Sequence, residues 1–334
     1  MVFCTLFDSY YLDKGIALYD SIDETTKDFT LFAFCFDDNC YEILKDINYE
    51  HMVAIHHSCI ENEELIRIKE ERSKAEYCWT CTPIIIEYVL DNYPVEECTY
   101  IDSDLFFYSD PIVLFDEIKH NNADVCIIEH RFNNDIQGKK FEERNGRFCV
   151  EFNYFKNNKK GRFALNWWKE KCLEWCYDIP EKDRMGDQKY LNDFPRLFDS
   201  IHILENLGAG VAPWNLKQYK LVSKENGIVL EKDGEKVTLV FYHFQNIRYM
   251  PGNMVNIKSL TSDKNIKYAI YIPYIRKIET IRKKITERYG IDFKSNKIVR
   301  SSNKLLGFLQ KYFASFKIRR ISDIIDLNKL DKYE

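Results

Sequence analysis

Short apolar runs alternate with amphipathic stretches along the first 250 residues of the chain. A continuous apolar run bounded by polar or turn residues is typical of a buried strand, whereas apolar residues that recur every three or four positions indicate a helix. The chain therefore predicts strands at residues 1–7, 29–36, 52–56, 98–101, 124–128 and 237–242. Such alternation favours an α/β fold with a mostly parallel central sheet, in which ligands bind beyond the carboxyl ends of the strands.

Two helices are indicated by particular residues. Thr82 followed by Pro83 has the form of an N-cap and a first helical residue, and apolar residues continue over 84–90, so we expect a helix to begin at this point. A second helix is indicated by apolar residues at helical spacing, which we interpret as a face packed in the core: Leu165, Trp168, Cys172 and Trp175.

Positive charge is concentrated towards the end of the chain. The net charge is −5, yet basic residues far outnumber acidic ones between residues 274 and 320. This shift predicts a boundary shortly after Pro251-Gly252, with an α/β domain over residues 1–255 and a basic helical C-terminal extension over 256–334.

An amphipathic helix is predicted within that extension, because apolar residues recur at helical spacing between 304 and 320 with basic residues among them. Such a helix either lies on an anionic membrane surface, giving peripheral membrane contact through residues 300–320, or packs on the main domain or another subunit. Both interpretations remain open. Since no nucleic-acid-binding module accompanies the basic residues, we expect no nucleic-acid partner.

The 11 cysteines are odd in number and scattered, which favours reduced thiols and a cytoplasmic location, with the inner membrane face as the site of any peripheral contact.

Asp8 interrupts the apolar residues 1–7 and no basic residue precedes them, so we do not interpret them as a signal peptide. No apolar run approaches the roughly 20 residues of a membrane span. Cys78 and Cys81 form a CxxC pair, which we interpret as buried thiols, with a metal or redox role as the alternative.

Two carboxylates follow the strand predicted at residues 98–101. Asp102 and Asp104 are two positions apart, so strand geometry would point both side chains the same way. Two carboxylates held together repel each other unless a cation lies between them, and Mg²⁺ and Mn²⁺ prefer such oxygen ligands. The alternative is a surface turn with two solvated acids.

An ordered set of short motifs accompanies this pair. They are residues 4–11 (CTLFDSYY), 75–80 (AEYCWT), 102–104 (DSD), 152–153 (FN), 186–191 (GDQKYL), 207–215 (LGAGVAPWN) and 242–244 (YHF). In this order they resemble the motifs of GT-A glycosyltransferases, in particular glycosyltransferase family 8 and its bacterial relatives. The resemblance covers roughly residues 1–250 and implies a GT-A fold.

The resemblance also implies a metal and a nucleotide site. Asp102, Asp104 and His243 would be the metal ligands, and an imidazole beside two carboxylates suits Mn²⁺ better than Mg²⁺. The donor would be a nucleotide sugar, mainly a UDP-sugar. Residues expected to contact its nucleotide or diphosphate are Thr5, Phe7, Tyr11, Ala75, Asp102, Ser103 and Arg248.

The sugar and acceptor contacts are implied in the same way. Asp187 and Gln188 would lie by the reacting sugar as catalytic residues, with a plain helix N-cap as the alternative for Asp187. Residues expected to bind substrate are His130, Asn153, Gly208, Trp214 and Asn215. The chain departs from the family pattern after Asn153, where no glycine follows, and after His243, where Arg248 would replace a lysine.

The expected activity is transfer of a sugar from a nucleotide diphosphate to a glycan or a lipid-linked acceptor, with retention of configuration implied by the resemblance. The alternatives are a sugar-phosphate nucleotidyltransferase and a non-catalytic nucleotide-sugar binder. A two-carboxylate hydrolase is disfavoured, because its acids lie at least about 5 Å apart in distinct environments.

Overall fold

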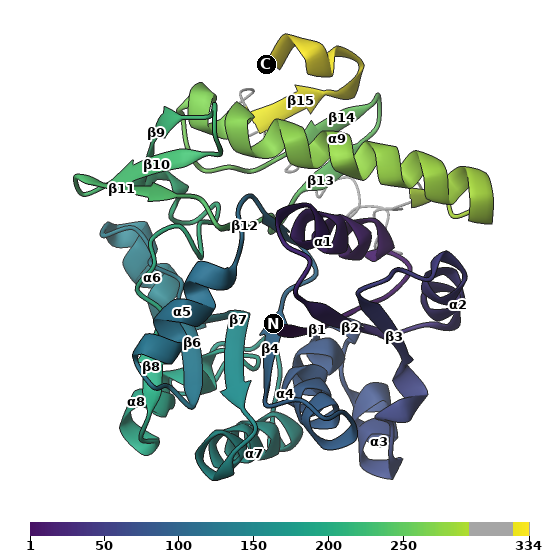
Figure 1. The fold of residues 1–334 in the computed structure, drawn as a ribbon, viewed down its shortest axis with the longest axis vertical. Helices are drawn as coiled ribbons and strands as arrows, with labels where there is room; N and C mark the ends of the chain where they lie inside the picture. The colour runs from purple at the N-terminus through teal and green to yellow at the C-terminus, as the bar shows by residue number, and fades with distance from the viewer. Residues whose placement is uncertain (294–322, 334) are drawn as a thin grey trace, which may run out of the picture.

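A seven-stranded sheet forms the centre of the computed structural model, which describes residues 1–293 and 323–333 (Figure 1). Its order is β3-β2-β1-β4-β7-β6-β8, and within it β7 runs antiparallel to both of its neighbours while the other pairs are parallel. The strands are β1 (Val2–Phe7), β2 (Thr30–Cys35), β3 (Met52–His56), β4 (Glu97–Ile101), β6 (Val125–Glu129), β7 (Phe148–Lys156) and β8 (Ile201–Ile203). The predicted α/β fold with a mostly parallel sheet is confirmed.

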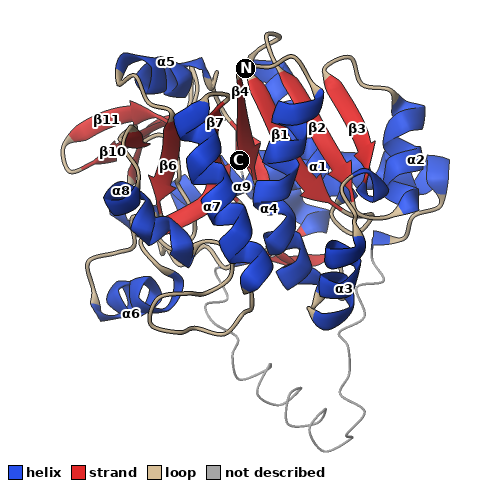
Figure 2. Ribbon diagram, turned by 90° about the horizontal axis from the view of Figure 1, so that it is seen from below, coloured by secondary structure: helices blue, strands red, loops and turns tan. Residues whose placement is uncertain are grey.

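Helices cover both faces of this sheet. One face packs against α3 (Glu63–Glu71), α4 (Lys74–Asn92) and α7 (Lys159–Glu174), and Figure 2 shows α4 and α7 side by side across it. The other face packs against α1 (Leu12–Thr25) and α5 (Ile112–His120). The remaining helices are α2 (Asp38–Ile47), α6 (Ile136–Asn145), α8 (Phe194–Leu197) and α9 (Lys264–Tyr289), with short 3₁₀ helices η1 (His57–Cys59), η2 (Lys189–Asp193), η3 (Leu216–Gln218) and η6 (Leu327–Tyr333).

The start of α4 differs from the prediction. The helix begins at Lys74, well before Thr82, because Ser73 and Glu76 form a reciprocal capping box that satisfies the free amide groups of its first turn. Pro83 then lies inside the helix instead of at its first position. The Thr82-Pro83 pair gave a misleading signal, since packing of the long apolar face outweighs one missing amide donor.

The helix predicted from Leu165, Trp168 and Cys172 is confirmed as α7, where these three side chains are buried. Trp175 is the C-cap residue of that helix.

Three smaller sheets complete the fold. Strand β5 (Leu105–Phe107) pairs with β12 (Phe241–His243), and this antiparallel pair continues directly from the end of β4. The strand predicted over 237–242 is therefore divided between β12 and β11 (Glu235–Thr238), which pairs in a separate sheet with β10 (Val229–Lys232) and β9 (Lys220–Ser223). The third sheet contains β13 (Arg248–Met250), β14 (Met254–Asn256) and β15 (Ile324–Asp326).

Helix α9 lies along α1 and shares its core (Figure 1). Its buried isoleucines and tyrosines belong to the same hydrophobic cluster as Phe7 of β1 and Phe106 of β5. The Arg282 side chain donates to the fully buried carboxylate of Asp13 on α1 at 2.6 Å, and its guanidinium stacks over the Tyr249 ring. Residues 256–293 therefore pack into the core of the preceding 255, and a division into two domains at residue 255 stays a prediction.

Within the described residues, no helix is both long enough and apolar enough to cross a membrane. The amphipathic helix predicted between 304 and 320, and with it the membrane contact expected for residues 300–320, falls outside the described residues.

Replacing Asp13 by alanine should destabilise the protein by about 3 kcal/mol, because the largely buried charge of Arg282 would keep only the more distant Glu279, at 3.7 Å, as a carboxylate partner. The matched control is Asp331→Ala, which breaks an ion pair between α9 and an almost fully exposed carboxylate and should leave the free energy of unfolding nearly unchanged. Urea unfolding of both variants measures the difference. Equal small losses would show that the contact between α1 and α9 does not depend on this ion pair.

Candidate active site

A cleft of about 510 Å³ lies beyond the carboxyl ends of β1 and β4, which is where parallel sheets bind ligands. Its volume is in the range of ligand pockets, which run from roughly 300 to 1,000 Å³. The residues that line it are Leu6, Phe7, Asp8, Tyr11, Lys74, Ala75, Cys78, Trp79, Tyr100, Asp102, Ser103, Asp104, His130, Asn145, Cys149, Val150, Met185, Gly186, Asp187, Gln188, His243 and Gln245.

Asp102, Asp104 and His243 meet at one side of this cleft. Beyond β4 the chain makes a tight turn, closed by the amide of Leu105 donating to the Asp102 carbonyl at 3.1 Å. Strand β5 then pairs with β12 so that Leu105 lies opposite His243. The His243 Nε2 atom is 3.1 Å from Asp104 Oδ1 and 3.7 Å from Asp102 Oδ2. The two carboxylates therefore converge through a turn and a strand pair, not through the strand alternation that the sequence suggested.

The charges of the three groups depend on one another. Burial raises the pKa of Asp102 to about 6, although the nearby His243 opposes the shift. Burial acts on Asp104 in the same sense, but His243 outweighs it and lowers the pKa of Asp104 to about 2. Burial disfavours a charged His243, yet Asp104 holds the His243 pKa well above its ordinary value. Without a metal ion, a proton on His243 thus balances the negative charge, and a bound cation would take that place.

Glu151 of β7 holds the other side of the His243 ring. Its fully buried Oε2 lies 2.6 Å from His243 Nδ1, so a proton on Nδ1 is shared with a carboxylate and Nε2 is left facing the two aspartates. The Tyr100 hydroxyl similarly donates to Asp102 Oδ1 at 2.9 Å. Glu151 was not predicted from the sequence, although a lone acid inside the apolar run 148–155 indicates a specific buried partner.

The residues expected to bind the nucleotide gather at the end of β1. Phe7 lies in the cleft with its ring against Gly15 of α1, and Ala75 and Ser103 also line it. Tyr11 forms the rim and is 44% exposed. Thr5 is buried below the cleft lining, and its hydroxyl has no hydrogen-bond partner among the described residues.

Lys74 also lines the cleft and forms an ion pair with Asp8, a contact that was not predicted from the sequence.

Asp187 and Gln188 line the part of the cleft next to the aspartates. Gly186, with a positive φ of 54°, packs its backbone against the ring of Trp79 and so sets the position of the residues that follow. Burial, with a smaller effect of the Asp102 charge, raises the pKa of Asp187 to about 8. Asp187 is not the N-cap residue of the following helix, because η2 has Gln188 at that position. The Gln188 side-chain amide donates to the Asn145 carbonyl at 3.0 Å.

Trp214 and Asn215 do not line the cleft but support His130, which does. The Trp214 indole and the Asn215 amide both donate to the His130 carbonyl, at 2.7 and 2.9 Å. The His130 ring stacks on Phe132, and burial lowers the pKa of His130 to about 3, so the imidazole is neutral.

Three other predicted contacts lie outside the cleft lining. Asn153 is fully buried on β7, opposite Tyr100, and neither polar atom of its side chain has a hydrogen-bond partner in the described ranges. Gly208 approaches the Thr238 carbonyl so closely that a side chain would collide with it, which explains the glycine without a substrate. Arg248 is exposed on β13. Direct substrate contact by these residues stays a prediction.

All 11 cysteines are free in the described residues. Cys78 and Cys149 line the cleft. Burial raises the pKa of both thiols to about 12, which keeps them protonated and poorly suited to redox chemistry.

Two proteins of Bacillus subtilis are similar to this chain over most of its length. No protein-family model matches it. The uncharacterized protein YfnF of Bacillus subtilis (strain 168) is 34% identical over 262 residues, which cover 76% of this chain and 84% of YfnF. The uncharacterized protein YfnD of the same organism is 30% identical over 279 residues, covering 82% and 87%. The chain belongs to the family of YfnF and YfnD.

The fold of this YfnF/YfnD family member is similar to that of the galactosyltransferase LgtC, solved in complex with donor and acceptor sugar analogues. The two match with a TM-score of 0.53 at 12% identity, over 84% of this chain and 96% of LgtC. An active-site mutant of LgtC matches with a TM-score of 0.51 at 11% identity, over 74% and 88%. At such identities the likeness shows the fold alone, and it confirms the predicted GT-A fold.

Replacing His130 by glutamine should remove an acid-dependent loss of stability. The pKa of His130 is about 3 in the folded protein and 6.5 as the ordinary value, so unfolding takes up a proton between these values. The contribution of His130 to the free energy of unfolding therefore falls by about 1.4 kcal/mol for each pH unit between about 6 and about 3. Urea unfolding at a series of pH values should show the difference between the native protein and the variant changing at this rate. Parallel curves would mean that His130 is not held neutral.

Proposed function

We propose that this chain is a metal-dependent glycosyltransferase, which moves a sugar from a nucleotide diphosphate, a UDP-sugar, to a glycan or lipid-linked acceptor. One observation carries the proposal: Asp102, Asp104 and His243 converge at the side of a cleft large enough for a nucleotide sugar, on a GT-A fold. Retention of configuration, implied by the resemblance to family 8, belongs to the same proposal.

The donor set of this site fits Mn²⁺. Two carboxylates and an imidazole offer oxygen and nitrogen ligands whose donor atoms lie within 4.8 Å of one another. Mn²⁺ accepts such a mixed set and leaves further positions for phosphate oxygens. The cation would supply charge neutralisation of the diphosphate leaving group.

The protein residues position the donor around that point. The Phe7 and Tyr11 rings, at the end of β1, provide apolar surface for the base. On the other side, the Asp187 carboxyl and the Gln188 amide can hydrogen-bond to sugar hydroxyls near the anomeric carbon. Because Asp187 is buried, its hydrogen bonds to a bound sugar would be made in a water-poor environment, where they are strong.

Nucleotide-sugar binding gives a direct prediction. A panel of nucleotide sugars, each with and without Mn²⁺, should raise the melting temperature for at least one donor, since a ligand at 100 times its Kd stabilises the folded state by about 3 kcal/mol. Asp104→Asn should lose the Mn²⁺-dependent part of this shift and lower donor hydrolysis or transfer by more than about 100-fold. Circular dichroism of the ligand-free variant checks that it remains folded.

The matched control for this experiment is Asp116→Asn, which changes an exposed aspartate on α5 and should behave like the native protein. Release of a nucleoside diphosphate identifies sugar transfer or donor hydrolysis, whereas release of pyrophosphate would indicate a nucleotidyltransferase. An unchanged Mn²⁺-dependent shift in Asp104→Asn would remove Asp104 from the metal site.

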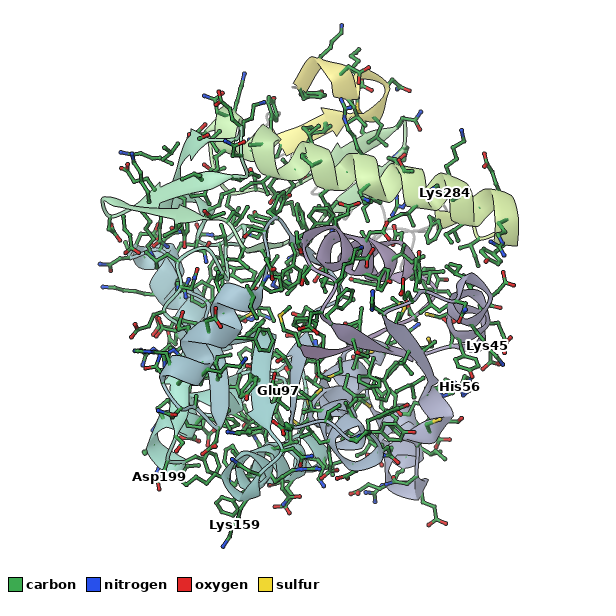
Figure 3. The ribbon with its side chains drawn as sticks, viewed as in Figure 1. Lys45, His56, Glu97, Lys159, Asp199 and Lys284 are labelled. Atoms are coloured by element: carbon green, nitrogen blue, oxygen red, sulfur yellow. The ribbon has the colours of Figure 1, made fainter. Side chains whose placement is uncertain are left out.

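Glu151→Gln should weaken Mn²⁺ binding by roughly 10- to 100-fold. Glutamine has the same size but carries no charge. Its side-chain NH₂ group can take the position of the carboxylate oxygen that faces His243 Nδ1 in the native protein. Electron paramagnetic resonance of free Mn²⁺ measures the affinity directly. Glu97→Gln is the control, because Glu97 accepts from Tyr154 at the far end of β4 and should leave Mn²⁺ affinity unchanged (Figure 3). Equal affinities in all three proteins would show that Glu151 does not support the ligand.

A further inference from the structure

A second group of ligating side chains lies at the outer edge of the central sheet, away from the cleft. His56 ends the edge strand β3, His57 begins η1, and Asp38 is the first residue of α2. Figure 3 shows His56 on this edge. None of the three residues lines the cleft described above.

The three side chains point their donor atoms at one another. Asp38 Oδ1 lies 2.8 Å from His56 Nε2 and 3.8 Å from His57 Nε2, and the three atoms all fall within 4.8 Å of one another. Ligands about 2.0 Å from a tetrahedral Zn²⁺ are roughly 3.3 Å apart, so the distances from Asp38 to the two imidazoles lie on either side of the spacing that a metal needs.

The second nitrogen of each ring already has a partner nearby. His57 Nδ1 lies 3.0 Å from Glu61 Oε2, which is within ion-pair distance but without the geometry of a hydrogen bond. Glu61 is in turn bound by Lys69 at 2.6 Å and by the Tyr77 hydroxyl at 3.1 Å. His56 Nδ1 lies 2.7 Å from the Ser58 hydroxyl. An acceptor near Nδ1 can support a metal-bound histidine, because a proton on Nδ1 leaves Nε2 with a free lone pair.

The metal-free state has its own hydrogen bonds. The Ser58 amide is 3.3 Å from His56 Nδ1, which favours the tautomer that donates from Nε2 to Asp38. A metal would therefore replace the proton between His56 and Asp38 and move it to Nδ1, where the Ser58 hydroxyl can accept it. Metal binding would therefore exchange the Ser58 amide bond to His56 Nδ1 for a bond from Nδ1 to the Ser58 hydroxyl.

We infer that Asp38, His56 and His57 form a binding site for a borderline-soft divalent cation, with Zn²⁺ the best fit and its fourth position open to water. Two imidazoles and one carboxylate suit Zn²⁺, whereas the oxygen-rich set in the cleft suits Mn²⁺. The bound cation would join the end of β3 to the first turn of α2 and would stabilise the folded state by mass action.

The test is Zn²⁺ titration of the full chain without an affinity tag, in an Asp104→Asn background that weakens the set in the cleft. Isothermal titration calorimetry should find one equivalent of Zn²⁺. Adding His57→Ala should weaken this binding at least tenfold, whereas adding His120→Ala, which removes an exposed histidine at the end of α5, should not. Asp38→Asn provides a second variant whose changed side chain is 86% exposed and so leaves folding intact.

Co²⁺ in place of Zn²⁺ gives an independent readout. The visible spectrum of the protein with Co²⁺ should have the strong bands of four-coordinate cobalt, and these should disappear in His57→Ala and in Asp38→Asn. The inference is overturned if the background protein binds no Zn²⁺, or if both variants bind Zn²⁺ with unchanged stoichiometry and affinity. Since the site is separate from the cleft, either result is independent of the proposed transferase activity.

Discussion

The close approach of two carboxylates and one imidazole at the end of β4 is the constraint on which the rest of the site depends. His243 Nε2 lies 3.1 Å from Asp104 Oδ1 and 3.7 Å from Asp102 Oδ2, and ionisable groups this close need a proton or a cation among them. The turn after Asp102 and the pairing of β5 with β12 impose this approach through backbone hydrogen bonds. The site is thus a preformed place for positive charge, open towards a cleft.

The surrounding fold keeps that arrangement rigid. Glu151 fixes one nitrogen of His243, and the Trp214 ring packs edge-on against the same imidazole at 5.3 Å. Helix α9 packs next to β12, where its Tyr274 ring stacks on the ring of Phe244, the residue after His243. The basic segment late in the sequence therefore contributes to the structure near the site, at least as far as residue 293.

Much of the fold and part of the site could be predicted from the sequence. The central strands were predicted because a strand that is buried on both faces is written as a continuous apolar run. The site residues Asp102, Asp104 and His243 were predicted because they follow such runs. What depends on tertiary contacts could not be read in this way. Glu151 acquires its role only because the fold brings its carboxylate on β7 to His243 of β12. The hydrogen bond from Trp214 to the His130 carbonyl likewise joins residues 84 positions apart, which no local pattern predicts. The start of α4 was missed because a capping box competes with the Thr82-Pro83 signal.

X-ray diffraction at the manganese absorption edge, from crystals grown with Mn²⁺ and a nucleoside diphosphate, tests the central claim most directly. The account predicts one strong anomalous peak in coordination contact with Asp102, Asp104 and His243 Nε2, with a diphosphate oxygen completing its shell. A structure in which the nucleotide occupies the cleft while no anomalous peak lies among these three side chains would contradict it.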